Sequence, residues 1–176
     1  MKMSTKRLCM LSLFTAATVI LGIYATFRIG NQIKVPFKFI TVFMTGAIFG
    51  PVSSGLVAAA ADILNAVLVP VGPPMLQITA VELFYGIVYG LCFFRAKNNN
   101  FYYVRAFICA SVQLLTGITV TTKILVDMGY FSSFTSAVTI RFPAAVVTFI
   151  LHMLVMCAMK GIIFRIKDYV RKEDEA

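Results

Sequence analysis

Two carboxylates, Asp62 and Glu82, stand inside apolar runs that are long enough to cross a membrane. A charge in hydrocarbon costs about 2.5–3.5 kcal/mol even on lenient insertion scales, so such a group usually faces a cavity or a partner. Asp62 lies eight residues before Pro70 and Glu82 lies eight residues after Pro74. At a rise of about 1.5 Å per residue, both acids are predicted to sit roughly 12 Å below the same surface. There they would accept hydrogen bonds from a ligand, with Asn65 on the helix face of Asp62.

The composition indicates that a membrane surrounds these acids. The chain has 176 residues, of which 60% are apolar and 13% are charged, whereas a soluble domain carries about a quarter charged residues. Its net charge of +9 lies in short gaps between apolar runs, as in membrane loops rather than in a surface that binds nucleic acid. We therefore expect one membrane domain over residues 1–176, with short tails at about 1–7 and 164–176.

Six apolar runs are candidate helices: Leu8–Phe27, Val35–Gly50, Val52–Val71, Met75–Phe94, Ala106–Thr122 and Phe142–Met159. The first is expected to be retained rather than cleaved, because it is long for a signal peptide and has no clear cleavage site. The second is short, but only if it crosses do the three clusters of Lys and Arg all face the cytoplasm. The expected fold is therefore an all-α membrane protein with six transmembrane helices and both termini cytoplasmic.

Several cations fall in the predicted outer loops, where topology does not favour them. An anionic ligand captured from outside explains them most simply, and this predicts an outward-facing pocket. The alternatives are that they contact lipid phosphates, or that each buried acid pairs with a cation such as Arg28 or Arg141. A proton relay is a third possibility for the acids, but no chain of further acids supports it. The cations are Arg28, Lys34, Lys38, Lys123 and Arg141.

Small residues spaced four apart recur along several runs and would let helix backbones approach closely. For Gly86 and Gly90 we expect internal packing. For the first and third helices a docking surface for a partner protein is an open alternative, made of Ser12, Ala16, Gly55 and Ala59.

Catalytic patterns are weak. Ser53-Ser54-Gly55 lacks the leading glycine of a membrane serine protease, and His152 lies in an apolar stretch that is typical of a packed histidine. No phosphate-binding loop or paired-aspartate metal motif is present. We therefore expect no enzyme, no cofactor and no metal site, and any ATP-driven step would need other subunits.

Several segments together resemble the substrate-binding S component of energy-coupling-factor (ECF) vitamin transporters, most closely the folate family. They are Phe37–Ile40, Gly46–Pro51 with Gly55, Asp62 with Leu68–Pro70 and Gly72, and Gly86–Leu91. The resemblance implies a multi-pass protein of the prokaryotic plasma membrane that docks onto a membrane coupling subunit and two cytoplasmic ATPases. The chain departs from the family pattern at Lys34–Phe39, near Asn65 and at Pro74–Thr79.

A folate-like ligand would suit these residues. Adjacent N–H donors of a pterin match a carboxylate acceptor such as Asp62 or Glu82. The two carboxylates of the glutamate tail would meet cations near the mouth, namely Arg28, Lys34, Lys38 or Lys123. Rings would stack on Phe37, Phe39 and Tyr130. The alternatives are another heterocyclic vitamin or precursor, and a stand-alone transporter or membrane scaffold.

Overall fold

The computed structural model describes residues 5–29, 33–69, 76–94 and 101–174, with the backbone alone described at 26–29, 33–36 and 168–174. In chain order the elements are α1 (Thr5–Tyr24), β1 (Thr26–Ile29), β2 (Ile33–Pro36), α2 (Phe39–Phe49), α3 (Pro51–Leu68), α4 (Leu76–Phe93), α5 (Tyr102–Thr116), η1 (Gly117–Thr121), α6 (Thr122–Asp127), α7 (Phe134–Ala158) and α8 (Lys160–Asp174). Apart from one hairpin, these elements are helical, as predicted.

Five of the described helices are long and apolar enough to cross a membrane: α1, α3, α4, the continuous helix Tyr102–Asp127, and α7. The sixth predicted helix is present as α2, but it has only 11 residues and is roughly 16 Å long. That is about half of a hydrocarbon core. Eight of its residues are buried, so its neighbours rather than lipid surround it.

The structure differs from the expected boundaries at several places, and the fifth helix covers Tyr102–Asp127 rather than Ala106–Thr122. The first helix ends at Tyr24, and the chain then forms the antiparallel hairpin β1–β2, in which Arg28 pairs with Lys34 through the backbone. The last spanning helix starts at Phe134 instead of Phe142, because Ser133 caps it by accepting a hydrogen bond from the backbone N–H of Ser136 at 3.3 Å. Most of the segment expected as a C-terminal tail belongs to helix α8.

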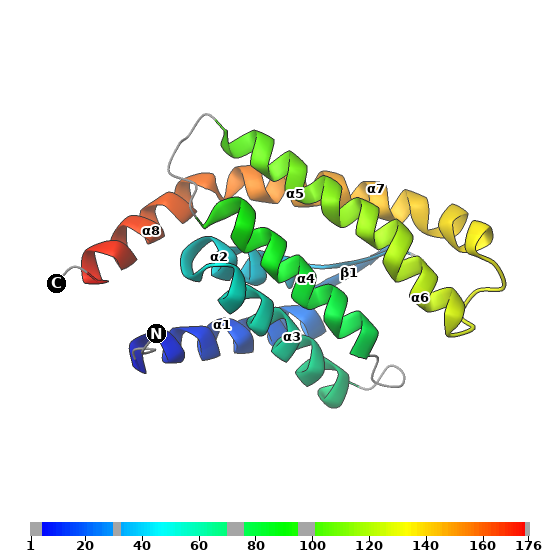
Figure 1. Ribbon diagram of the computed structural model, residues 1–176, viewed down its shortest axis with the longest axis horizontal. Coiled ribbons are helices and arrows are strands. Elements are labelled where there is room, and N and C mark those ends of the chain that lie inside the picture. The colour runs from blue at the N-terminus through cyan, green and yellow to red at the C-terminus, as the bar shows by residue number, and fades with distance from the viewer. Residues whose placement is uncertain (1–4, 30–32, 70–75, 95–100, 175–176) are drawn as a thin grey trace.

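Helices α1 to α4 pack closely together (Figure 1). A side chain at Gly86 would place its Cβ 2.6 Å from the carbonyl oxygen of Ser54, and one at Gly90 would overlap the backbone of Pro51. The turn between α2 and α3 is made by Gly50, whose φ of +94° suits glycine, followed by Pro51 in the first turn of α3. The predicted internal role of Gly86 and Gly90 is therefore confirmed, and α3 and α4 are held as a rigid pair.

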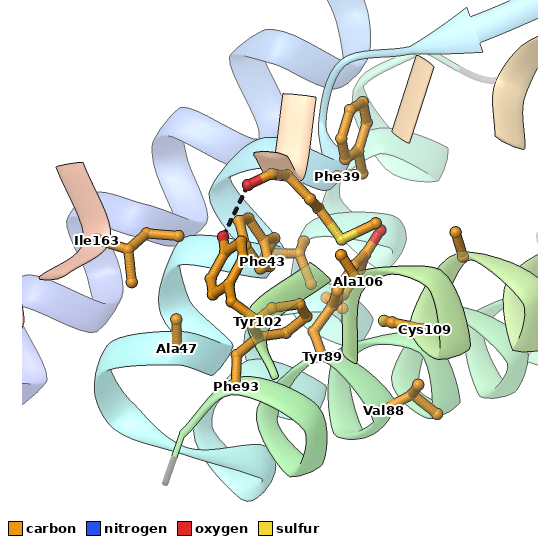
Figure 2. Packing of buried hydrophobic residues seen from close by; sticks show 14 residues of the cluster. Phe39, Phe43, Ala47, Val88, Tyr89, Phe93, Tyr102, Ala106, Cys109 and Ile163 are labelled. Atoms are coloured by element: carbon orange, nitrogen blue, oxygen red, sulfur yellow. Dashed lines mark hydrogen bonds between the residues drawn. The ribbon is translucent and has the colours of Figure 1, made fainter. Parts of the chain in front are cut away.

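The second part of the molecule is formed by the continuous helix α5–η1–α6 and by α7, which runs beside it (Figure 1). At the end near the chain termini an aromatic cluster joins it to α2 and α4, as Figure 2 shows. The rings of Phe43 and Phe93 meet edge to face at 4.8 Å, and the Tyr102 hydroxyl donates to the Met156 carbonyl at 2.7 Å. Helix α8 joins this end through Lys167, whose Nζ donates to the carbonyls of Phe93 at 2.6 Å and Phe94 at 3.2 Å.

Candidate ligand-binding site

A cavity of about 680 Å³ lies between α2 and α4 on one side and α5, η1, α6 and α7 on the other. Its walls are mainly apolar and aromatic, with a few charged and polar groups among them. The polar and aromatic lining residues are Lys38, Phe39, Glu82, Tyr85, Tyr89, Gln113, Thr121, Phe131, Arg141, Thr148, Phe149 and His152. This size and lining are typical of sites that bind small molecules.

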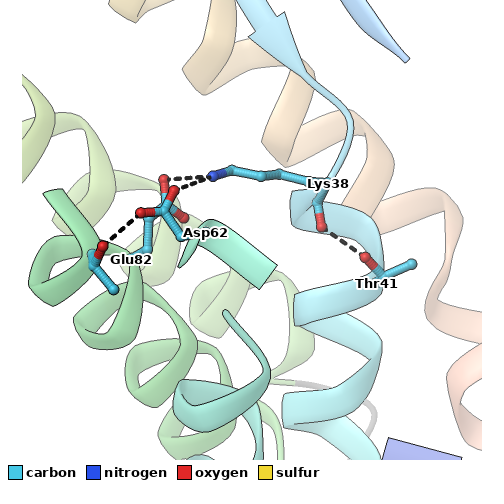
Figure 3. Close-up of polar contacts among 5 residues, drawn as sticks. Lys38, Thr41, Asp62 and Glu82 are labelled. Atoms are coloured by element: carbon cyan, nitrogen blue, oxygen red, sulfur yellow. Dashed lines mark hydrogen bonds and ion pairs between the residues drawn. The ribbon is translucent and has the colours of Figure 1, made fainter. Parts of the chain in front are cut away.

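A three-residue ion cluster stands at one wall (Figure 3). Lys38, just before α2, places its Nζ 3.0 Å from Glu82 Oε1 and 3.4 Å from Asp62 Oδ1. The three side chains are 17–21% exposed, so Lys38 points inward, which disfavours for this residue the alternative of contact with lipid phosphates. Among the described side chains, Lys38 and not Arg141 is thus the partner of both acids, while the side chain of Arg28 lies outside the described residues.

The two acids in this cluster have different surroundings. Asp62 accepts from the Thr79 hydroxyl at 2.8 Å as well as meeting Lys38, and it is absent from the cavity wall. Glu82 lines the cavity. With one cation and two carboxylates, the cluster carries a net charge of about −1 when all three groups are ionised. Glu82 is therefore the acid that can accept hydrogen bonds from a ligand, and Asp62 holds Lys38 in place.

Arg141 lies in the opposite wall, on α7. Its Nη1 donates to the Thr122 hydroxyl at 3.2 Å, and among the described side chains it forms no ion pair with a carboxylate. A cation inside an apolar cavity is costly unless an anion compensates it. The site therefore has an acceptor on the α4 wall and a cation on the α7 wall that is open to an anionic ligand.

A polar link crosses the cavity floor between α4, α5 and α7. The Gln113 carbonyl oxygen accepts from the Tyr89 hydroxyl at 3.0 Å and lies 2.7 Å from His152 Nδ1. The His152 ring lies 3.9 Å from the Phe39 ring. His152 is well packed, as expected, but it also lines the cavity. Sequence reasoning missed these cavity residues because a polar or aromatic group in an apolar helix gives no sign of the direction it faces.

Of the nine predicted ligand residues whose side chains are described, the structure brings four to the cavity: Lys38, Phe39, Glu82 and Arg141. Phe37 stacks on Phe39 at 6.4 Å, just outside the lining. Asn65 turns toward Gly22 of α1, and its buried Oδ1 has no hydrogen-bond partner within the part of the chain that the structure describes. Lys123 and Tyr130 are exposed and do not line the cavity. Arg28 and Lys34 stand opposite each other in the hairpin, and their side chains lie outside the described residues.

The four residues suggested for partner docking are not equivalent. Ser12 and Ala16 are exposed on α1, and Ala59 is half-buried on α3. Gly55 is buried against α4, where a Cβ would come within 3.2 Å of the Leu83 carbonyl oxygen. Gly55 therefore serves internal packing between α3 and α4. On α1, Ser12 and Ala16 remain an exposed pair of small residues.

Comparison with known proteins agrees with this architecture. The family model of the ECF-type riboflavin transporter S component matches residues 2–163. The chain belongs to this family of multi-pass membrane proteins, which is a family of transporter components rather than of enzymes.

Two individual proteins add detail. The folate transporter FolT of Clostridium novyi (strain NT) is 34% identical over 65 residues, which cover 37% of this chain and 38% of that protein. A crystal structure of FolT bound with folic acid matches with a TM-score of 0.78 at 19% identity, over 89% of this chain and 93% of that one. At this identity the structural likeness establishes the fold, and the sequence match spans little more than a third of the curated relative.

Proposed function

We propose that this chain is the substrate-capture subunit of an ECF-type importer and that it binds folate or a related pterin in the cavity. The observation that carries the proposal is the opposed pair of groups in the cavity walls, with the Glu82 carboxylate on α4 and the Arg141 guanidinium on α7. A pterin edge carries adjacent N–H donors that suit a carboxylate, and the tail of folate carries two carboxylates that suit a guanidinium. Phe39, Tyr85 and Phe149 supply aromatic walls for the rings.

Riboflavin is the second candidate, because the matching family model carries its name. Its ring system would also suit the aromatic walls, but the molecule is uncharged and would leave Arg141 without an anion. The charge of the cavity therefore favours folate. The partial match to a folate transporter points the same way.

Calorimetric titration of the detergent-solubilised protein tests the ligand. Folic acid is expected to bind with a Kd between nanomolar and low micromolar, roughly −8 to −12 kcal/mol, and riboflavin more weakly. Glu82→Gln should weaken folic acid by about 1.5–3 kcal/mol, as for the loss of a hydrogen bond to a charged group. Asp127→Asn, at an exposed carboxylate outside the cavity, is the matched control. Tighter binding of riboflavin would reassign the ligand, and unchanged folate binding in Glu82→Gln would discard this site.

Uptake requires a coupling protein, and we propose that the termini and the basic loops face the cytoplasm while the hairpin end faces outward. The proposed partners are a transmembrane coupling subunit and two ATPases, with docking on the exposed small residues of α1. Ala16→Trp should abolish uptake and complex formation while the affinity for folic acid in detergent stays the same. Val147→Trp, at a lipid-exposed position of α7, should leave both intact. Normal uptake by Ala16→Trp would move the docking surface elsewhere.

A further inference from the structure

The long helix from Tyr102 to Asp127 is interrupted at the cavity. Residues Gly117–Thr121 form a π-helical turn, η1, between α5 and α6. Such turns are rare and often lie at functional sites, because one extra residue in the turn changes the direction of the side chains that follow. Gly117, Ile118 and Thr121 line the cavity, so the interruption faces the proposed ligand.

Thr122, the first residue after this turn, has a hydrogen bond that differs from those of its neighbours. Thr116 and Thr119 each donate to the carbonyl four residues back, Val112 and Leu115. Thr122 donates to the carbonyl of Gly117, five residues back, at 3.2 Å. Its side chain is fully buried at 0% exposure. Because the hydroxyl donates its single proton to the Gly117 carbonyl, its oxygen can only accept a hydrogen bond from any further partner.

That partner is Arg141 Nη1, 3.2 Å away. A guanidinium recognises a carboxylate best through two parallel N–H bonds, which requires the plane of the group to be fixed. The side chain of Arg141 is long and reaches the cavity from α7, and the Thr122 contact is the side-chain hydrogen bond that the structure describes for it. The hydroxyl of Thr122 therefore restricts the plane in which Arg141 meets a ligand.

We propose that Thr122 is a positioning residue for ligand specificity: the π-helical turn aims its hydroxyl at Arg141, which is thereby held ready for the ligand carboxylate. This inference rests on the proposed function for the nature of the ligand. Thr122, which is buried and does not itself line the cavity, would thus determine how strongly the protein prefers anionic ligands.

Two probes separate positioning from a structural effect: folic acid, and 6-hydroxymethylpterin, which has no carboxylate. Thr122→Val, which keeps the shape and removes the hydroxyl, should weaken folic acid about tenfold and 6-hydroxymethylpterin by less than about twofold. Thr122→Ser should restore folate binding. Thr119→Val, within the π-helical turn at an exposed residue whose hydroxyl donates to the Leu115 carbonyl, should behave as wild type. Equal weakening of both probes by Thr122→Val would overturn the proposal.

A double-mutant cycle with Arg141→Gln tests whether the two residues act together. If Thr122 acts through Arg141, the double variant Thr122→Val with Arg141→Gln should bind folic acid no more weakly than Arg141→Gln alone. Additive losses would contradict the proposal.

A ligand-free measurement distinguishes failure of this inference from failure of the folate assignment. Phenylglyoxal reacts with free guanidinium groups, and mass spectrometry reports its reaction with Arg141. The reaction should be several-fold faster in Thr122→Val than in Thr119→Val or Thr122→Ser. If wild type binds no folic acid, the folate assignment fails while this rate still tests the contact, and equal rates would refute the positioning role.

Discussion

The α1–α4 half (Thr5–Phe93) and the α5–α7 half (Tyr102–Ala158) are built in opposite ways. In the first, glycines bring backbones together so closely that α3 and α4 leave no space for a methyl group at Gly86 or Gly90. In the second, the main helix contains a π-helical turn and α7 contains Pro143. The buried residues of α7 are Ala137 and Met156. The contrast indicates that one half is a closely packed frame and that the other forms a cavity wall from irregular helices.

The largest expected effect comes from disturbing the frame. Gly90→Ala adds one methyl group that would overlap the backbone of Gly50 and Pro51. Backbone cannot move aside as a flexible side chain can, so we expect a loss of more than about 3 kcal/mol or failure to yield monodisperse protein. Thermal unfolding in detergent and size-exclusion chromatography report both outcomes.

Gly161→Ala adds the same methyl group in α8, where nothing lies within 4 Å. It should be neutral or stabilise by up to about 1 kcal/mol through helix propensity. Similar melting temperatures for the Gly90 and Gly161 variants would show that the frame is not packed around Gly90 as closely as described.

The second effect concerns the charge cluster that joins α2, α3 and α4. Lys38→Met leaves Asp62 and Glu82 without their cation, so the folded state should lose about 3 kcal/mol, as when one partner of a buried ion pair is removed. Lys123→Met, at an exposed cation, should change the free energy of unfolding by less than about 0.5 kcal/mol. Equal stability of the two variants would mean that solvent already compensates the acids.

The third prediction tests the link between the two halves. Gln113→Leu removes the shared acceptor of the buried Tyr89 and the half-buried His152. We expect a loss of about 1–3 kcal/mol in thermal unfolding, together with weaker folate binding, because both partners line the cavity. A stability loss with unchanged affinity would assign the link to folding alone.

The smallest effect is expected at α8. Burial, with help from the nearby charge of Arg105, lowers the pKa of Lys167 to about 8, below its usual value of about 10.4. Between these values the unfolded chain binds more protons, so the free energy of unfolding should rise with pH over this window. The side chain is only half-buried, so solvent screening should limit the gain to less than about 1 kcal/mol. The rise should be absent from Lys167→Met, and equal pH profiles would refute this account.

Much of the frame could be predicted from the sequence. Pro70 and Pro74 mark the turn between two apolar runs, and that symmetry placed Asp62 and Glu82 at one level, where a single Lys38 now reaches both. The glycine spacing likewise predicted close helix packing. These inferences succeeded because prolines, glycines and buried charges have few alternative uses in a membrane helix.

The cavity wall was harder to predict for a physical reason. Tyr85, Gln113 and Thr148 lie in apolar runs, where a side chain facing lipid, a neighbouring helix or a ligand has the same local sequence. The π-helical turn had a visible signal in the β-branched run Ile118–Thr122, since such residues fit an α-helix poorly. The spacing of Ile162, Ile163 and Ile166 is likewise typical of one face of a helix, and it indicates α8.

The short length of α2 has a consequence for how the protein responds to its bilayer. Because α2 is almost entirely enclosed, acyl chains do not contact most of it, and its roughly 16 Å length creates no hydrophobic mismatch. The helix Tyr102–Asp127 and α7, with 26 and 25 residues, are each longer than a hydrocarbon core of about 30 Å, and they tilt or extend beyond it. We therefore expect the thickness of the surrounding lipid to act on these two long helices, which line the cavity, and not directly on the enclosed α2.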